Sequence, residues 1–333
     1  MRPAAERRTG TGLRVGLRVA VASAIVSVAG VVGLGLPGCT DDPGATKVSV
    51  SEKRVSAVVT IAPLAGIVRE LLPAGSEVTI LMPPGRSEHG YEFTPKDLAT
   101  IGKADLVVQV GLGLEPKVEQ FLREHPSEGR AEVVLGQVLG ISEGAEGHEH
   151  HAHDEHGNCL HDHGVDPHVW LDPVLVAEAV PALAEAVIKA GARTKEDLTG
   201  TTRAAQEQLI KRLRELDAEY AEALKPFQGR AIVTHHAAWG RLASRYGLRV
   251  ADVLRPAESS EPTPEQMASV VEALKRENVP AVFIEPQYDA KSARRIADQA
   301  GLPVKTLDPL GEGDYFAMMR SNLGVLVSAL NGK

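Results

Sequence analysis

The chain lacks the sequence signatures of several large classes of protein. No HExxH or P-loop motif occurs in its 333 residues, which argues against the enzyme classes that these motifs mark. Basic residues are also in the minority, because 36 Lys and Arg face 44 Asp and Glu and give a net charge of −8. This deficit of positive charge disfavours nucleic acid as a partner.

Charge is also missing from residues 19–38, which follow five arginines: Arg2, Arg7, Arg8, Arg14 and Arg18. A basic segment followed by an apolar one is typical of a secretory signal peptide. The apolar run ends at Leu36-Pro37-Gly38-Cys39, which resembles a bacterial lipobox. We therefore expect a lipoprotein signal peptide over residues 1–38 and a lipid on Cys39. The alternative is an uncleaved anchor, since the run approaches the length of about 20 residues that spans a membrane. Both interpretations place residues 40–333 outside the cytoplasm.

Cysteine is scarce, and Cys159 is the only one besides Cys39. If Cys39 carries lipid, Cys159 has no partner and the exported chain cannot rely on an internal disulfide. Residues 39–53 are polar and rich in turn-forming residues, so we expect a flexible tether there. Just under 300 residues remain after the leader, which is enough for about two domains.

Short apolar segments alternate with helical ones from residue 54 onwards. Strands are predicted within 54–62, 77–83, 105–111 and 131–137, with helices between them, and a second series of the same kind runs from 229 to 331. This alternation is typical of parallel βαβ units. We therefore predict an α/β fold with two lobes, residues 54–194 and 227–333, each built on a parallel sheet flanked by helices.

The segment between the two series contains no proline over residues 195–225. Leu209, Leu213, Leu216, Tyr220 and Leu224 recur there every three or four residues, which predicts one apolar stripe on a long helix. We expect a rigid linking helix over residues 195–226. The cleft between the lobes is then the expected ligand site.

Residues that can bind metals follow the predicted strands, where ligands collect in open parallel sheets. They are Glu88 and His89, His235 and His236, Glu285, and Asp308, together with His168, which lies before a helix expected near Pro173. Three imidazoles and a carboxylate, from His89, His168, His236 and Asp308, would suit Zn²⁺ and, less well, Mn²⁺.

Two of these positions have a second interpretation. His235 and His236 are adjacent, so only one of them should face the cleft. Glu285 could orient a ligating imidazole without touching the metal, or it could cap the helix that follows it.

Four stretches, residues 83–111, 166–173, 232–248 and 282–311, resemble in this order the metal-binding lipoproteins of ABC importers, specifically their ZnuA-type zinc-uptake branch. The resemblance covers about residues 54–331. It implies that His89, His168, His236 and Asp308 bind the metal, and that Glu88 approaches it in some members. Manganese-selective relatives tend to carry Glu at the position of His236, which favours zinc here. Two residues depart from the pattern: Ala237 replaces a common Asp, and Arg241 stands where an aromatic residue is common.

Seven of the twelve histidines lie within residues 148–164: His148, His150, His151, His153, His156, His161 and His163. The resemblance implies a loop of this composition before the second ligand. The segment has no apolar periodicity, which predicts a mobile loop over 146–163, and its mostly neutral imidazoles could gather Zn²⁺ weakly. We interpret it as an accessory that captures or senses metal. The alternative is a solvated loop with no role in transport.

We therefore expect a monomeric, lipid-anchored extracytoplasmic receptor that delivers Zn²⁺, as cargo, to an ABC permease and its ATPase. The alternatives are a receptor for manganese or another divalent metal, and a surface protein that sequesters metal or acts as an adhesin. A zinc hydrolase would need an open coordination position for water and a nearby base. Four protein ligands would close that position.

Overall fold

The structure is a computed structural model that describes residues 55–141, 165–255 and 263–332. The expected signal peptide (1–38), tether (39–53), lipidated Cys39 and histidine-rich loop (146–163) lie outside the described residues. Within the described ranges, no helix has the length and hydrophobicity needed to cross a membrane.

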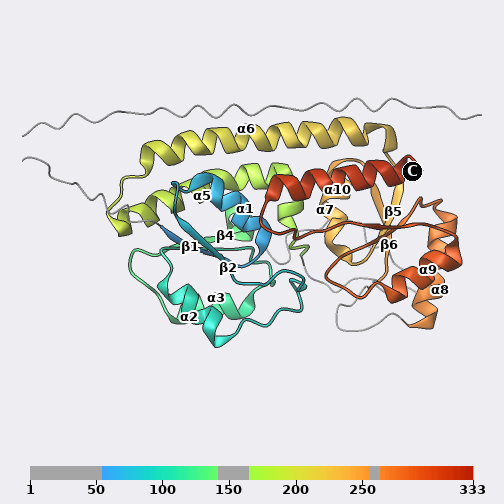
Figure 1. The fold of residues 1–333 in the computed structure, drawn as a ribbon, viewed down its shortest axis with the longest axis horizontal. Helices are drawn as coiled ribbons and strands as arrows, with labels where there is room; N and C mark the ends of the chain where they lie inside the picture. Colours follow the sequence, from blue (N-terminus) through green and yellow to red (C-terminus); the bar gives the residue numbers. More distant parts are fainter. Residues whose placement is uncertain (1–54, 142–164, 256–262, 333) are drawn as a thin grey trace, which may run out of the picture. The chain divides into compact units, whose positions relative to one another are not determined.

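The first lobe is built on a parallel sheet with the strand order β2-β1-β3-β4 (Figure 1). Its elements are β1 (Ser56–Val59), α1 (Ala62–Leu71), β2 (Glu77–Ile80), α2 (Pro95–Lys103), β3 (Leu106–Gln109), α3 (Pro116–Glu124), β4 (Ala131–Val134) and α4 (Leu135–Val138). Alternate strand residues face opposite sides of the sheet. Val59 of β1 therefore packs in the cluster that contains α1, whereas Val58 packs with Ile101 of α2 and Val118 of α3.

The second lobe repeats this plan with the strand order β6-β5-β7-β8, again parallel. Its elements are β5 (Ala231–Thr234), the 3₁₀ helix η3 (Ala237–Trp239), α7 (Gly240–Arg245), β6 (Arg249–Val253), α8 (Pro264–Arg276), β7 (Val282–Ile284), α9 (Lys291–Ala300), β8 (Val304–Thr306) and α10 (Tyr315–Leu330). Val233 and Val282 pack against α8 and α9, while Ile232 and Phe283 join the cluster that reaches the first lobe. Two parallel sheets flanked by helices confirm the predicted fold class.

A long helix, α6 (Thr199–Leu224), links the lobes, and Figure 1 shows it running beside α10. The predicted stripe from Leu209 to Leu224 is buried. The predicted start at residue 195 is wrong, because Lys195 adopts a left-handed conformation (φ 66°) that ends the preceding helix, α5 (Pro173–Thr194). After Leu224 the chain continues as the 3₁₀ helix η2 (Lys225–Phe227).

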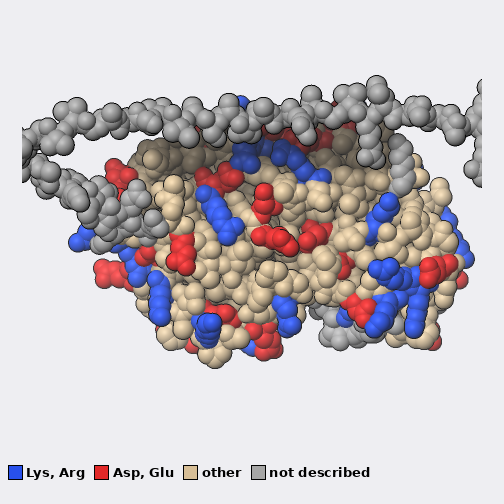
Figure 2. Space-filling view, in the orientation of Figure 1, with Lys and Arg blue, Asp and Glu red and all other residues tan. Residues whose placement is uncertain are grey.

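The buried stripe, rather than surface charge, holds α6 in place. Figure 2 shows basic and acidic side chains interspersed on one face of the molecule, and exposed ion pairs join α6 to its neighbours: Arg203 with Glu185, Arg212 with Glu70, and Glu219 with Arg320. Such pairs contribute about 0–1 kcal/mol each. By contrast, the Tyr220 hydroxyl is buried and donates to the Met319 carbonyl of α10 at 2.5 Å.

Two helices begin at threonines whose side chains cap them. The Thr94 side chain accepts a hydrogen bond from the Asp97 amide, and α2 begins at Pro95. Thr263 and Gln266 form a capping box at the start of α8. Each cap satisfies amide groups that the helix itself leaves unpaired.

Candidate metal centre

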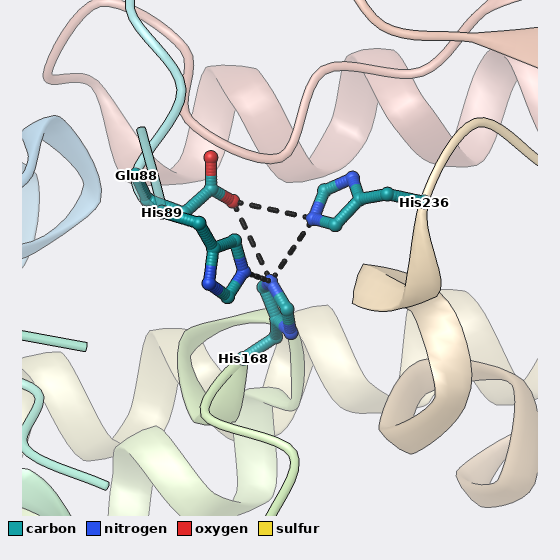
Figure 3. Close-up of side chains that lie close together, drawn as sticks. All are labelled: Glu88, His89, His168 and His236. Atoms are coloured by element: carbon teal, nitrogen blue, oxygen red, sulfur yellow. Dashed lines mark hydrogen bonds and ion pairs between the residues drawn. The ribbon is translucent and has the colours of Figure 1, made fainter. Parts of the chain in front are cut away.

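Four side chains from three separate segments converge on one point (Figure 3). Glu88 and His89 lie in the loop between β2 and α2, His168 immediately precedes the 3₁₀ helix η1 (Val169–Leu171), and His236 follows β5. One potential ligand atom from each residue lies within 4.8 Å of the others. The first lobe therefore contributes Glu88, His89 and His168 to this group, and the second lobe contributes His236.

The spacing of these atoms fits a single tetrahedral cation. The Nε2 atom of His168 lies 3.2 Å from Nε2 of His89 and 3.1 Å from Nε2 of His236. Oε1 of Glu88 lies 3.5 Å from Nε2 of His168 and 3.6 Å from Nε2 of His236. Ligand atoms on a tetrahedral zinc with bonds of about 2.0–2.1 Å are roughly 3.3 Å apart. Four of the six separations between these atoms are therefore close to those that one zinc ion requires, and all six are within 4.8 Å.

Three of the four side chains at the centre are buried. Glu88, His168 and His236 expose 2–3% of their surface, whereas His89 is exposed. Both carboxylate oxygens of Glu88 are buried without a hydrogen-bond partner among the described residues, and a buried carboxylate left in that state is costly. A cation bound among these four side chains would satisfy the Glu88 oxygens, and His89 lies on the exposed side of the group.

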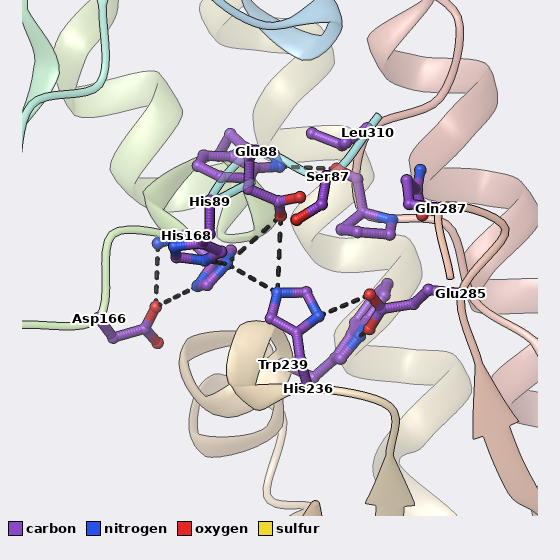
Figure 4. A network of polar contacts seen from close by, with 12 residues as sticks. Ser87, Glu88, His89, Asp166, His168, His236, Trp239, Glu285, Gln287 and Leu310 are labelled. Atoms are coloured by element: carbon purple, nitrogen blue, oxygen red, sulfur yellow. Dashed lines mark hydrogen bonds and ion pairs between the residues drawn. The ribbon is translucent and has the colours of Figure 1, made fainter. Parts of the chain in front are cut away.

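Each of the two buried imidazoles contacts a carboxylate through Nδ1, the ring nitrogen that faces away from the centre (Figure 4). Nδ1 of His168 lies 2.7 Å from Oδ1 of Asp166, and Nδ1 of His236 lies 2.6 Å from Oε2 of Glu285. The indole of Trp239 donates to the other oxygen of Glu285 at 3.0 Å. A carboxylate at Nδ1 keeps the proton on that nitrogen, so that the Nε2 lone pair points at the centre.

The charges within the group shift the pKa values in opposite directions. Burial alone would raise the pKa of Glu88, but the nearby imidazoles of His168 and His236 lower it well below its usual range. Burial alone would lower the pKa of His236, but the charge and hydrogen bond of Glu285, together with Glu88, raise it well above its usual range. The pKa of His168 is raised in the same way, by Asp166 and Glu88 against the effect of burial. Carboxylates thus surround a point that favours positive charge.

Asp308, the acid predicted as the fourth ligand, does not join the group. Its Oδ1 accepts hydrogen bonds from the side-chain amide of Gln287 at 2.8 Å and from the backbone amides of Leu310 and Gly311 at 3.0 and 3.1 Å. This oxygen therefore closes the turn after β8. Glu88 supplies the carboxylate at the centre instead.

The side chains of the two adjacent histidines point in different directions, as their spacing predicts. His236 faces the centre, whereas Nδ1 of His235 accepts a hydrogen bond from the Glu285 amide at 3.3 Å, and its ring centroid lies 4.6 Å from that of Tyr288. Glu285 itself contacts His236 from behind and contributes no atom to the group of four.

Sequence reasoning gave no role to Asp166 or to the indole of Trp239. Oδ1 of Asp166 accepts from the backbone amide of His168 at 2.9 Å as well as from its ring. An Asp that bonds the backbone two residues ahead is a common turn device. The Asp-Pro-His order was therefore the signal that could have identified Asp166.

Comparison with known proteins places this geometry in a family. The chain matches the sequence profile of the family described as ZnuA, zinc-uptake complex component A, periplasmic, over residues 57–329. It is 29% identical over 301 residues to the high-affinity zinc uptake system protein ZnuA of Bacillus subtilis, covering 86% of this chain and 91% of that protein.

Two further matches agree with this result. The chain is 28% identical over 295 residues to the zinc-binding protein AdcA of Streptococcus pyogenes, covering 83% of this chain but 56% of AdcA, so it spans about half the length of that relative. A crystal structure of ZnuA matches with a TM-score of 0.69 and 23% identity, covering 83% of this chain and 99% of the other, and supports the fold. Because the profile extends over most of the sequence and includes all four side chains at the centre, the chain belongs to the ZnuA family of periplasmic zinc-uptake components.

Proposed function

We propose that the protein is an extracytoplasmic receptor that binds one Zn²⁺ between its lobes and hands it to the permease of an ABC importer. The observation that carries this proposal is the convergence of three Nε2 atoms and one buried carboxylate within 4.8 Å. The ion is cargo, so no bond in a substrate is made or broken. Membership of an uptake family supports the same role.

The proposed ligands are His89, His168, His236 and Glu88. Glu88 replaces Asp308 in the ligand set, because its oxygens are buried and have no hydrogen-bond partner, whereas Oδ1 of Asp308 accepts three hydrogen bonds. Three imidazole nitrogens and one carboxylate oxygen suit tetrahedral zinc, while manganese prefers a larger set of oxygen ligands. We therefore propose zinc over manganese.

The remaining parts of the proposal concern the domain boundaries and the segments outside the described residues. Residues 1–38 would be removed as a signal peptide, Cys39 would carry the lipid, and residues 39–53 would tether a monomeric receptor to the membrane. The domain boundaries follow as 54–194 for the first lobe and 227–333 for the second. The histidine-rich loop at 146–163 would gather zinc near the centre without forming the tight site.

Zinc import and zinc sequestration at the cell surface predict different results in living cells. Cells that lack this gene and are starved of zinc should regain uptake of radioactive zinc when they receive the wild-type gene. The His236→Ala gene should not restore it, although its protein is made and exported. Uptake that is unaffected by loss of the gene, despite tight zinc binding by the purified protein, would contradict import and favour sequestration.

A further inference from the structure

Arg241 on α7 of the second lobe reaches the segment that carries His168. Its Nε and Nη2 atoms donate to the backbone carbonyl of Asp166 at 3.0 and 2.6 Å, and Nε lies 3.8 Å from the Asp166 carboxylate. The Arg241 side chain is 14% exposed. These contacts span 75 residues of sequence and are partly shielded from water, so they should be stronger than exposed ion pairs.

Asp166 is therefore held from two sides. Arg241 fixes its backbone carbonyl, while its Oδ1 accepts from both the backbone amide and the ring of His168. The guanidinium acts on the position of Asp166, and Asp166 sets the direction in which the His168 ring points. A chain of contacts thus runs from α7 to one proposed ligand.

The segment of residues 236–241, which contains Arg241, also contains the second buried imidazole and a contact to its carboxylate partner. His236 is itself a proposed ligand, and three residues later Trp239 donates to Glu285, which holds the His236 ring. Residues 236–241 therefore contact both of the carboxylates that orient imidazoles. A planar guanidinium offers two donors to one carbonyl, which the aromatic side chain expected at position 241 cannot do.

We propose that Arg241 is a positioning residue that couples the second lobe to His168 through Asp166 and thereby slows zinc release. The inference rests on the proposed function, because it assumes that zinc binds at the four-residue centre. Separation of the lobes would have to break the Arg241 hydrogen bonds as well as the bonds to the metal. Contacts of this kind, which must break before the ligand leaves, act mainly on the dissociation rate.

Arg245 provides a matched control on the same helix. It lies one turn after Arg241, and its Nε donates to Oδ2 of Asp172 at 2.5 Å. Asp172 caps α5 and is not hydrogen-bonded to an imidazole in the described structure. Arg245→Met therefore removes an arginine–carboxylate pair of α7 without touching the support of His168.

The first experiment measures zinc dissociation from the full-length protein with a chelator in a stopped-flow instrument. Loss of an outer partner of a metal ligand typically weakens the site about 10- to 100-fold. We expect Arg241→Met to speed release by about tenfold or more and Arg241→Lys to have an intermediate effect. Arg245 also joins α7 to the first lobe, but not through His168, so Arg245→Met should speed release much less than Arg241→Met does. Melting temperatures of the metal-free variants report any general loss of stability separately.

The second experiment tests whether Arg241 acts through His168. In a His168→Ala background, Arg241→Met should cause no further loss of zinc affinity in an equilibrium competition assay, because the two changes break the same chain of contacts. A full additive loss would overturn the proposal, as would wild-type release rates for Arg241→Met or equal acceleration by Arg245→Met. If the wild-type protein fails to bind zinc tightly, the proposed function is wrong, whatever the Arg241 variants do.

Discussion

The Nε2 atoms of His168 and His236 lie 3.1 Å apart, and the Nδ1 atom of each ring contacts a carboxylate on its other side. Two imidazoles held in this way direct their lone pairs at the same point. The arrangement is repulsive until a proton or a metal ion occupies that point. Both the affinity for zinc and its dependence on pH should follow from this relationship.

Removal of either buried imidazole should abolish tight zinc binding. Loss of an orienting partner alone costs about 10- to 100-fold in metal affinity, so loss of a ligand should cost more than about 100-fold. His168→Ala and His236→Ala are to be compared by competition against a chelator of known affinity. His125→Ala is the control, because that ring is exposed and stacks on Phe121 of α3, with centroids 4.4 Å apart. A wild-type dissociation constant for either ligand variant would contradict the assignment.

Glu88→Gln should weaken zinc binding more than Asp308→Asn does. Glu88 offers a buried charge without a hydrogen-bond partner, whereas an Asn at position 308 can still accept the amides of the turn after β8. Isothermal titration of both variants with zinc measures the difference. The opposite order would return Asp308 to the place of fourth ligand.

Glu285→Gln should lower zinc affinity by about 10- to 100-fold while leaving all four ligands in place. The carboxylate accepts from the His236 ring at one oxygen and from the Trp239 indole at the other. An amide accepts at only one end, so one of these donors loses its acceptor. Trp239→Phe removes the indole donor alone and should have a smaller effect by the same titration. Unchanged affinity in Glu285→Gln would mean that the His236 ring is held by other contacts.

Zinc affinity should fall as the pH drops from about 7.5 to about 5.5, because zinc must displace protons from the imidazoles. Their neighbouring carboxylates raise the pKa values of His168 and His236 in the metal-free protein, so protons compete there at and below neutral pH. The lowered pKa of Glu88 keeps its carboxylate charged throughout this range.

The same linkage fixes the sign of the stability effect. An imidazole whose pKa is raised in the folded protein stabilises the metal-free fold at pH values below its pKa in the unfolded chain. This stabilisation is lost as the pH rises through the pKa of the imidazole in the folded protein. Zinc should therefore raise the melting temperature more at high pH than at low pH. Equal zinc affinity at the two pH values would argue against imidazole ligation.

Deletion of residues 146–163 should leave one tight zinc site and remove only weaker additional ones. The four proposed ligands lie outside this segment, and a histidine-rich stretch without apolar periodicity should bind zinc in several weak ways. Equilibrium dialysis over a range of free zinc counts both classes of site. Loss of the tight site on deletion would reverse the roles assigned to the loop and the centre.

The fold could be predicted from the sequence because its local signals agree with its packing. Short apolar runs gave the strands, and the stripe from Leu209 to Leu224 gave the linking helix. The start of that helix was missed because Lys195 adopts a left-handed conformation, which is costly for a residue other than glycine. The junction between α5 and α6 imposes this conformation, and no local pattern reveals it.

The imidazoles of the centre were predictable, but the carboxylate was not. His89 and His236 follow from the rule that ligands collect at the carboxyl ends of parallel strands, whereas His168 was identified by its place before the helix that starts at Pro173. That rule applies equally to Glu88 and Asp308. The difference between them depends on hydrogen bonds from Gln287, Leu310 and Gly311 to Asp308, which exist only once the turn has folded. Arg241 was noticed in the sequence as a departure from the family pattern, and its contact with Asp166 required the tertiary structure.

A crystal structure of the zinc-loaded protein, with anomalous data collected on both sides of the zinc absorption edge, would show whether zinc binds at the four-residue centre. We expect one strong zinc peak bonded to Nε2 of His89, His168 and His236 and to a carboxylate oxygen of Glu88, at distances of about 2.0–2.2 Å. A peak elsewhere in the molecule, with these four side chains uncoordinated, would contradict this expectation.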